Sequence, residues 1–284
     1  MVLAGVRDRL APLQSWLFPR RVYLQLEDQA LEAMVLEAER LVWHERVPLP
    51  QGVCENGAPV AVEALGDLLG DWLIERGYPG AHVKAVLPRA ATAWRVIEWP
   101  DGQWPEAPEL VVRQQQGELD LPWSLQDADL WLEPLLGDPP RSLLLAVQRQ
   151  LLEAWIQVCS QAGIALDGLE ALPICLWRAV KPQLEDGVQV VLQLDDQQSW
   201  LLALEQGQPL GEWPCPPAGE RLEEPLRRWA QRYSPTAGRL IGSESTVQTW
   251  LPQLTAWLGC PVTPFEPGGG TAALWGLAAG ERQP

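Results

Sequence analysis

Histidines, paired cysteines and long apolar runs are all scarce in this chain of 284 residues. The only histidines are His44 and His82, and the five cysteines lie far apart, with no C-x-x-C pair. No Cys/His zinc site is therefore expected, because neither residue type has the spacing of a ligand set. We expect the thiols to be buried and reduced, as in a cytosolic protein. They are those of Cys54, Cys159, Cys175, Cys215 and Cys260.

No apolar run approaches the ~18–20 residues of a membrane span, and the N-terminus lacks the apolar core of a signal peptide. Basic residues are also few, since 21 Lys and Arg stand against 37 Asp and Glu, for a net charge of −16. Such a charge repels nucleic-acid backbones and anionic lipid surfaces, so neither is expected as the main partner. With 47% hydrophobic and 20% charged residues, a globular cytoplasmic protein is predicted, reaching a membrane only through a partner.

Phenylalanine and tyrosine are rare, with two and three residues, whereas tryptophan occurs 16 times. Tryptophan either fills aromatic core positions in this chain or forms part of a partner surface, because it is enriched in interface hot spots. Both interpretations stay open for the segment 94–131, where tryptophans concentrate. The candidate partner-binding residues are Trp94, Trp99, Trp123 and Trp131.

The second part of the sequence repeats the first. LQLEDQ at 24–29 returns as LQLDDQ at 192–197, and the apolar register then continues without a gap. Met34 aligns with Leu202, and Pro48 aligns with Pro216. An ungapped match of this length predicts two tandem copies of one folding unit. Each copy is predicted to open with a strand, a polar tip and a returning strand.

Hydrophobic periodicity predicts an α/β protein with mixed sheets. Strand patterns occur at 21–27, 30–37, 40–48, 82–87, 92–99, 130–135, 142–147, 164–169, 239–241 and 260–265, with a second hairpin at 188–213. Helical patterns occur at 60–76, 108–117, 148–162, 173–180, 219–233, 245–258 and 271–279. The loop 48–59 is predicted to be irregular, and glycines 268–270 to form a turn into the last helix.

The predicted organisation is a duplicated fold with a small inserted α+β subdomain. Residues 21–87 and 142–181 form the first half, 88–141 the inserted subdomain, and 182–284 the second half. Residues 1–20 form a lead-in whose apolar residues recur at helical spacing up to Pro19. This lead-in is either a docking helix or a frayed terminus.

Several segments, taken in order, resemble one known family. They are LFPRR at 17–21 before the first strand, VLP at 86–88, EWP at 98–100, LPWSLQD at 121–127, and the strand, helix, Gly, strand and Pro-led helix of 143–180. Their order and spacing are similar to those of PilM, the cytoplasmic actin-like protein of type IV pilus assembly, and of its relatives HofM and the cytoplasmic domain of GspL. The resemblance covers most of the chain, although no single motif is diagnostic. It implies a duplicated actin-like (ribonuclease H-like) fold.

The same resemblance implies a partner and a place. The chain would sit at the cytoplasmic face of the inner membrane and bind the cytoplasmic tail of a PilN-like single-pass protein. Other proteins of the pilus machine are further candidate partners. The tail would lie in a groove between the first half and the small subdomain, and the Trp-rich segment is the candidate wall of that groove.

The two tips depart from the family pattern. PilM-type proteins that bind ATP carry Asp-Ile-Gly-Ser-Ser-like tips, in which glycine lets backbone N–H groups approach phosphate. Here the tips read Glu27-Asp28-Gln29 and Asp195-Asp196-Gln197, and the Gly-rich adenosine turn is reduced to Gly242. Two like charges ~5 Å apart repel by roughly 3 kcal/mol at an effective dielectric of ~20. We therefore expect a degenerate nucleotide site, no cofactor and no ATPase activity.

Alternatives remain open. Magnesium can bridge acids to phosphate, which would make the chain a working ATPase or a relative of sugar kinases. The platform domain of a type II secretion system is a third interpretation; such domains usually continue into a membrane span, and we expect none here. Ser243 and Ser245 lack a G-x-S-x-G elbow, and acids at hairpin tips are usually solvated turn residues. No catalytic or metal-binding residue is therefore predicted.

Overall fold

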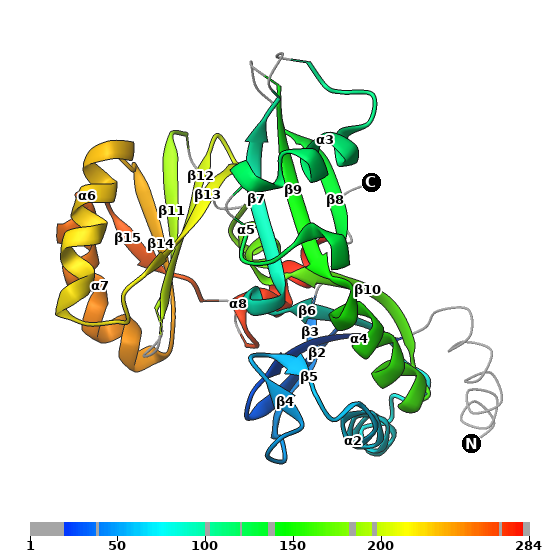
Figure 1. Ribbon diagram of the computed structural model, residues 1–284. Coiled ribbons are helices and arrows are strands. Elements are labelled where there is room, and N and C mark those ends of the chain that lie inside the picture. The colour runs from blue at the N-terminus through cyan, green and yellow to red at the C-terminus, as the bar shows by residue number, and fades with distance from the viewer. Residues whose placement is uncertain are drawn as a thin grey trace. The chain divides into compact units, whose positions relative to one another are not determined.

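The computed structural model describes residues 20–37, 40–99, 103–119, 121–135, 140–181, 186–194, 198–266 and 269–280. The strands among them form two five-stranded sheets, one three-stranded sheet and one short hairpin (Figure 1). The chain divides into two compact units, Met1–Ala90 with Gln150–Glu170 and Ala91–Arg149 with Ala171–Pro284. Apart from Arg20, the predicted lead-in lies outside the described residues.

The sheet of the first unit has the strand order β10-β6-β1-β2-β3. Strands β1, β2 and β3 form consecutive antiparallel pairs, and β6 pairs with β1 in parallel. The bounds are β1 Arg21–Glu27, β2 Ala30–Glu37, β3 Arg40–Pro48, β6 His82–Leu87 and β10 Ala165–Ala171. The predicted hairpin strands are confirmed at these positions.

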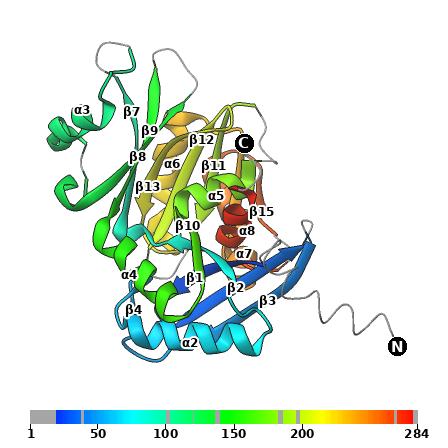
Figure 2. The ribbon, with the colours of Figure 1, turned by 90° about the vertical axis from the view of Figure 1, so that its right-hand side faces the viewer.

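Helices α2 (Val62–Glu75) and α4 (Arg149–Gln161) lie side by side against this sheet (Figure 2). Glycines make their close approach possible, because a Cβ on Gly66 would lie 2.5 Å from Cβ of Gln161, and one on Gly70 would lie 3.0 Å from the Ala162 carbonyl oxygen. Trp155 of α4 is fully buried. The buried apolar positions Leu65, Leu69 and Leu73 of α2 and Leu151, Trp155 and Val158 of α4 recur at helical spacing, so each helix buries one apolar face.

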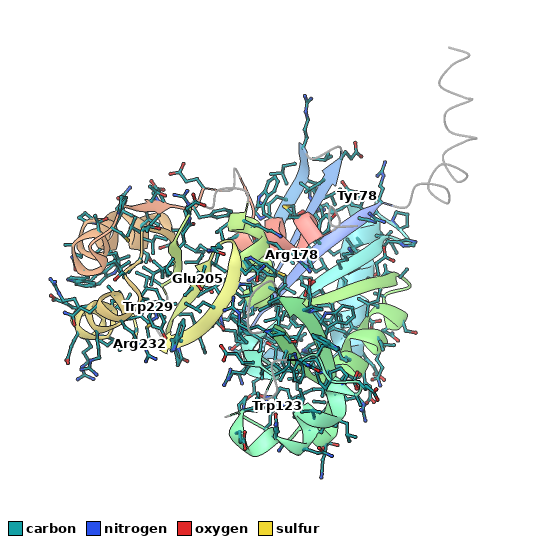
Figure 3. All side chains as sticks on the ribbon, turned by 90° about the horizontal axis from the view of Figure 1, so that it is seen from above. Tyr78, Trp123, Arg178, Glu205, Trp229 and Arg232 are labelled. Atoms are coloured by element: carbon teal, nitrogen blue, oxygen red, sulfur yellow. The ribbon has the colours of Figure 1, made fainter. Side chains whose placement is uncertain are left out.

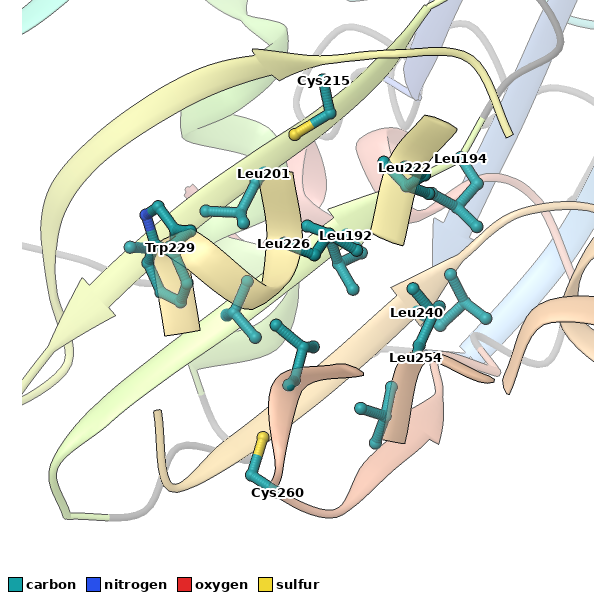
Figure 4. Close-up of a cluster of buried hydrophobic side chains, with 14 residues drawn as sticks. Leu192, Leu194, Leu201, Cys215, Leu222, Leu226, Trp229, Leu240, Leu254 and Cys260 are labelled. Atoms are coloured by element: carbon teal, nitrogen blue, oxygen red, sulfur yellow. The ribbon is translucent and has the colours of Figure 1, made fainter. Parts of the chain in front are cut away.

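The sheet of the second unit has the order β13-β12-β11-β14-β15. Helices α6 (Glu223–Tyr233) and α7 (Glu244–Leu258) cover one face and enclose an apolar core (Figure 4). The strand bounds are β11 Val188–Gln193, β12 Ser199–Glu205, β13 Gln208–Cys215, β14 Ala237–Ile241 and β15 Val262–Pro264. This core combines Leu192 and Leu201 from the strands with Leu226 and Leu254 from the helices.

The two five-stranded sheets reproduce the tandem repeat in their pairing. Leu24 pairs with Ala33 in the first sheet, and the aligned Leu192 pairs with Leu201 in the second. Each sheet also has a register shift at the same aligned place, after Val35 in the first copy and after Ala203 in the second. A bulge is a specific local device that re-aims a strand. Its recurrence confirms that the sequence contains two copies of one unit.

The second unit also contains a three-stranded sheet of order β7-β9-β8. Helix α3 (Pro108–Gln114) packs on one face over a small apolar cluster. The strands are β7 Thr92–Glu98, β8 Ala128–Leu135 and β9 Arg141–Gln148. The middle strand β9 begins at Arg141, which is the predicted end of the inserted subdomain. The predicted domain boundaries stay a prediction.

Two helices of the second unit pack against each other at very short range. They are α5 (Leu172–Val180) and α8 (Ala272–Ala279), and most residues of both are buried. Gly276 faces the backbone of Cys175 with no room for a side chain. The predicted helices at 173–180 and 271–279 are confirmed, and Thr271 caps the second by accepting a hydrogen bond from the Leu274 N–H.

The prediction of an irregular loop at 48–59 is wrong in part. A short hairpin forms there from β4 (Cys54–Glu55) and β5 (Ala58–Pro59). Its turn residues Asn56 and Gly57 have φ values of 53° and 76°. Asn-Gly favours two-residue hairpin turns because both residues tolerate positive φ, so the signal was present in the sequence.

The cysteines follow the expectation for reduced thiols. All five are free and buried. Burial raises the pKa of Cys159 and of Cys215 to about 11. These thiols are neutral at physiological pH and serve as small apolar core residues.

Candidate functional site

The first tip is held by the β4–β5 hairpin. Asp28 Oδ1 accepts a hydrogen bond of 2.8 Å from the backbone N–H of Gly57. The Cys54 thiol lies 4.0 Å from the same oxygen. Burial, together with the negative charges of Asp28 and Glu27, raises the pKa of this thiol to about 12. The Asp28 carboxylate thus bonds to a glycine N–H of the chain itself.

The other two residues of the first tip also have partners within the first unit. Glu27 Oε2 accepts a hydrogen bond of 2.6 Å from Nη2 of Arg46, and the Gln29 carbonyl accepts one of 2.9 Å from the Leu49 N–H. Arg46 Nη1 also lies 3.5 Å from Glu32, a buried carboxylate that is 2.7 Å from Nε2 of His44. Glu27 therefore belongs to a charged network across β1, β2 and β3.

Gly57 lies so close to the first tip that no side chain would fit at its position. A Cβ at this position would lie 2.8 Å from Cβ of Pro88 and 3.3 Å from the Leu26 carbonyl oxygen. Its positive φ adds a second reason for glycine. Among the described residues, the glycine N–H that bonds to this tip is that of Gly57 in the following hairpin, and it donates to the Asp28 carboxylate.

The core of the second tip, Asp195, Asp196 and Gln197, lies outside the described residues. At its base, the Leu194 N–H donates a hydrogen bond of 3.1 Å to the Ile241 carbonyl, directly before Gly242. A Cβ on Gly242 would lie 3.8 Å from the Leu194 carbonyl oxygen. The structure therefore places Gly242 beside the start of the second tip, although the two lie in separate segments of the sequence.

The N-terminus of α7 follows Gly242 and is capped by its own residues. Ser243 Oγ accepts a hydrogen bond of 3.2 Å from the Thr246 N–H and lies 2.9 Å from Oγ of Ser245. Capping of this kind satisfies one of the free N–H groups of the first turn. The two serines thus have a structural role, and neither contacts a histidine among the interactions of the described residues.

No protein-family model matches this sequence, and no curated protein is significantly similar to it. Solved structures are similar over nearly the whole chain. A PilM–PilN type IV pilus biogenesis complex contains a chain that matches with a TM-score of 0.76 and 19% identity, covering 93% of this chain and 99% of that one. The chain has the actin-like ATPase fold.

Two further structures support this fold. A Bacteroides thetaiotaomicron protein with an actin-like ATPase fold matches with a TM-score of 0.54 and 12% identity, over 91% of this chain and 95% of that one. The cytoplasmic domain of EpsL, an inner-membrane component of the Vibrio cholerae type II secretion system, has a TM-score of 0.52 and 12% identity, over 93% of this chain and 96% of that one. The predicted duplicated actin-like fold and the similarity to PilM are thereby confirmed.

The small sheet separates the four candidate tryptophans onto two faces. Trp99 is 4% exposed, donates to Ser142 Oγ over 2.7 Å and packs in the cluster beneath α3. Trp123 is half-buried and packs against the same cluster; its position is labelled in Figure 3. Trp94 and Trp131 belong to the opposite face, because both pair with Leu145 of β9. The four residues do not line one surface.

On that opposite face, exposure rises from one edge of the sheet to the other. Trp94 is 5% exposed, and its Nε1–H donates to Glu212 Oε2 over 3.0 Å. Leu145 in the middle strand is half-buried, and Trp131 on β8 is 65% exposed. Among the candidate tryptophans, Trp131 is thus the one whose indole is mostly in contact with solvent.

We expect Asp28→Ala to lower the free energy of unfolding by roughly 1–3 kcal/mol, because the part-buried Gly57 N–H would lose a charged acceptor. Urea unfolding measures the loss, and amide exchange at Gly57 locates it. Glu55→Ala, which removes an exposed acid from the same hairpin, is the matched control. Equal stability and equal exchange in the Asp28 and Glu55 variants would contradict the assigned role of Asp28.

Proposed function

We propose that this chain is a cytoplasmic scaffold of a type IV pilus, competence or secretion machine, that it binds the cytoplasmic tail of a PilN-like inner-membrane protein, and that it does not hydrolyse ATP. One observation carries the proposal: the fold matches, over 93% of the chain, a protein solved in a PilM–PilN complex. The similarity to the cytoplasmic domain of EpsL points to the same kind of machine.

The contacts of the first tip support the absence of a nucleotide. Phosphate binding at such a tip needs backbone N–H groups that are free to face the anion. Here Asp28 already accepts the Gly57 N–H, and Glu27 is paired with Arg46. A phosphate placed at this tip would meet two carboxylates in place of donors. The same tip would need to rearrange before it could bind ATP.

In the part of the chain that the structure describes, no helix is long and apolar enough to cross a membrane. We place the protein at the cytoplasmic face of the inner membrane through its partner. We assign the exposed Trp131 on β8 to partner binding. Trp94 and Trp99 are buried, and we assign them to core packing.

Titration of ATP with magnesium into the purified chain tests the nucleotide half of the proposal. We expect no heat by calorimetry and no shift in melting temperature at millimolar ATP. A bound nucleotide at ~100 times its Kd would add about 2.7 kcal/mol of stability, which a melting experiment detects. Micromolar binding that requires magnesium would contradict the proposal and favour the ATPase interpretation. A Glu27→Gln variant would then show whether the tip acids hold the metal.

A further inference from the structure

Strand β8 is an edge strand with an exposed aromatic residue at its centre. Within the described residues it pairs on one side, with β9, and β7 forms the other edge of the sheet. Trp131 is 65% exposed at the middle of this strand. An edge strand offers a row of backbone groups to another chain, and an exposed tryptophan offers a large rigid contact surface.

Two carboxylates flank Trp131 on the same face of β8. Asp129 and Glu133 are each two positions away, and side chains at alternate positions of a strand share one face. Asp129 is already paired with Arg149, with 3.0 Å between Oδ1 and Nη2. Glu133 lies opposite Leu143, so its near cross-strand neighbour is apolar. The electron-rich face of an indole beside a carboxylate is a combination that attracts a cation.

The outward backbone of β8 is open to strand addition on the N-terminal side of Pro134, because a proline supplies no outward N–H and ends such pairing at its own position. Pro134 lacks an N–H and is tolerated in a strand where that group would face away from the neighbour. In an antiparallel pair the N–H and C=O of one residue point to the same side and alternate along the strand. Leu130 and Leu132 are separated from Pro134 by four and two positions, so their backbone N–H and C=O groups would point to the same side as the nitrogen of Pro134, away from β9. A strand paired there places its residue opposite Trp131 on the same face as the indole.

We propose that the β8 edge binds an extended, cationic segment by strand addition, with a Lys or Arg side chain over Trp131 and against Glu133. This inference rests on the proposed function, because the occupant is taken to be the cytoplasmic tail of the membrane partner. Charge complementarity favours it, since the chain has a net charge of −16 and the carboxylates flank the apolar contact. Specificity then comes from the alternate side chains of the tail, and the backbone pairing supplies register.

Fluorescence anisotropy with a labelled synthetic peptide of the partner's cytoplasmic tail tests this inference on the full chain. We expect Trp131→Ala to weaken binding roughly tenfold or more, as for a buried aromatic anchor. Trp131→Leu retains apolar area but loses the π face, and it is expected to lose most of the preference for a cationic peptide. Trp104→Ala is the matched control, because Trp104 is 41% exposed and makes an edge-to-face contact with Trp99, at the opposite face of the sheet.

A double-mutant cycle identifies the cation. Glu133→Gln should weaken binding of the parent peptide several-fold and have no effect on a peptide whose Lys and Arg are replaced by glutamine. If the parent protein binds the tail and both the Trp131 and the Glu133 variants bind as tightly, the inference is overturned and the proposed function stands. If the parent protein does not bind the tail, the proposed function fails and the inference fails with it.

Discussion

Gly276→Ala is expected to destabilise the second unit severely. A Cβ at this position would lie 1.6 Å from the carbonyl oxygen of Cys175 and 2.4 Å from its carbonyl carbon. The atoms in the way belong to the backbone of α5, so no side-chain rotation relieves the overlap. The two helices would have to separate, although both are largely buried. We expect a loss of roughly 3 kcal/mol or more, at the upper end of overpacking effects.

A loss of this size lowers the melting temperature of a domain by about 6–12 °C. Circular dichroism during thermal unfolding measures the shift. Gly117→Ala is the matched control, because a Cβ at Gly117 would have no atom within 4 Å and the same residue change is made. A Gly276→Ala protein that melts with the parent would show that α5 and α8 are not packed as described.

The second large effect is expected for Trp155→Ala in the first unit. Trp155 is fully buried, with 0% of its surface exposed, and is the largest side chain buried to this extent in the part of the chain that the structure describes. It lies on α4, the helix that packs closely against α2 at Gly66 and Gly70. Removing a buried tryptophan costs about 3–5 kcal/mol because transfer free energy and packing are both lost.

Trp155→Phe separates volume from hydrogen bonding. The indole N–H of Trp155 has no hydrogen-bond partner among the described residues. Replacement by phenylalanine should therefore cost clearly less than replacement by alanine. Ile156→Ala, at the adjacent and 58% exposed position, should change stability by less than about 0.5 kcal/mol. Similar losses for Trp155→Ala and Ile156→Ala in urea unfolding would contradict the described packing of α4.

The regular elements could be predicted because each has a local signal, which is either a periodicity or a short apolar run bounded by polar residues. Strand β3 alternates in burial along its whole length, whereas β1 and β2 are apolar runs buried at most positions, and the bounds of all three agree with the ranges read from the sequence. The tandem repeat was visible from residues alone, and the matching bulges after Val35 and Ala203 show that it extends to pairing geometry. The sequence was therefore sufficient to predict these strands and the repeat, because the signals for both lie within contiguous segments.

Contacts between distant segments could not be predicted in the same way. The β4–β5 hairpin has an Asn-Gly turn, but strands of two residues carry no periodicity. The bond from the Gly57 N–H to Asp28 joins a tip to a later hairpin, so neither segment alone indicates it. The sequence therefore identified the acids of the first tip and missed the group to which one of them binds.

The tryptophans illustrate the same limit. Their density in segment 94–131 suggested one binding wall, but Trp99 packs under α3, whereas Trp131 lies on the other face. The difference depends on the parity of each residue within its strand and on the register of β9 between β7 and β8. One residue of shift would exchange the two faces. Exposure then distinguishes Trp131 from the buried Trp94.

The most direct test of the scaffold proposal is calorimetric titration of the full chain with the cytoplasmic tail of a PilN-like membrane protein, with a scrambled tail as control. We predict saturable binding of the native tail, little or no heat from the scrambled tail, and no effect of ATP with magnesium on either titration. Absence of binding by the native tail, with the chain folded, would contradict the proposal that this protein is a tail-binding scaffold.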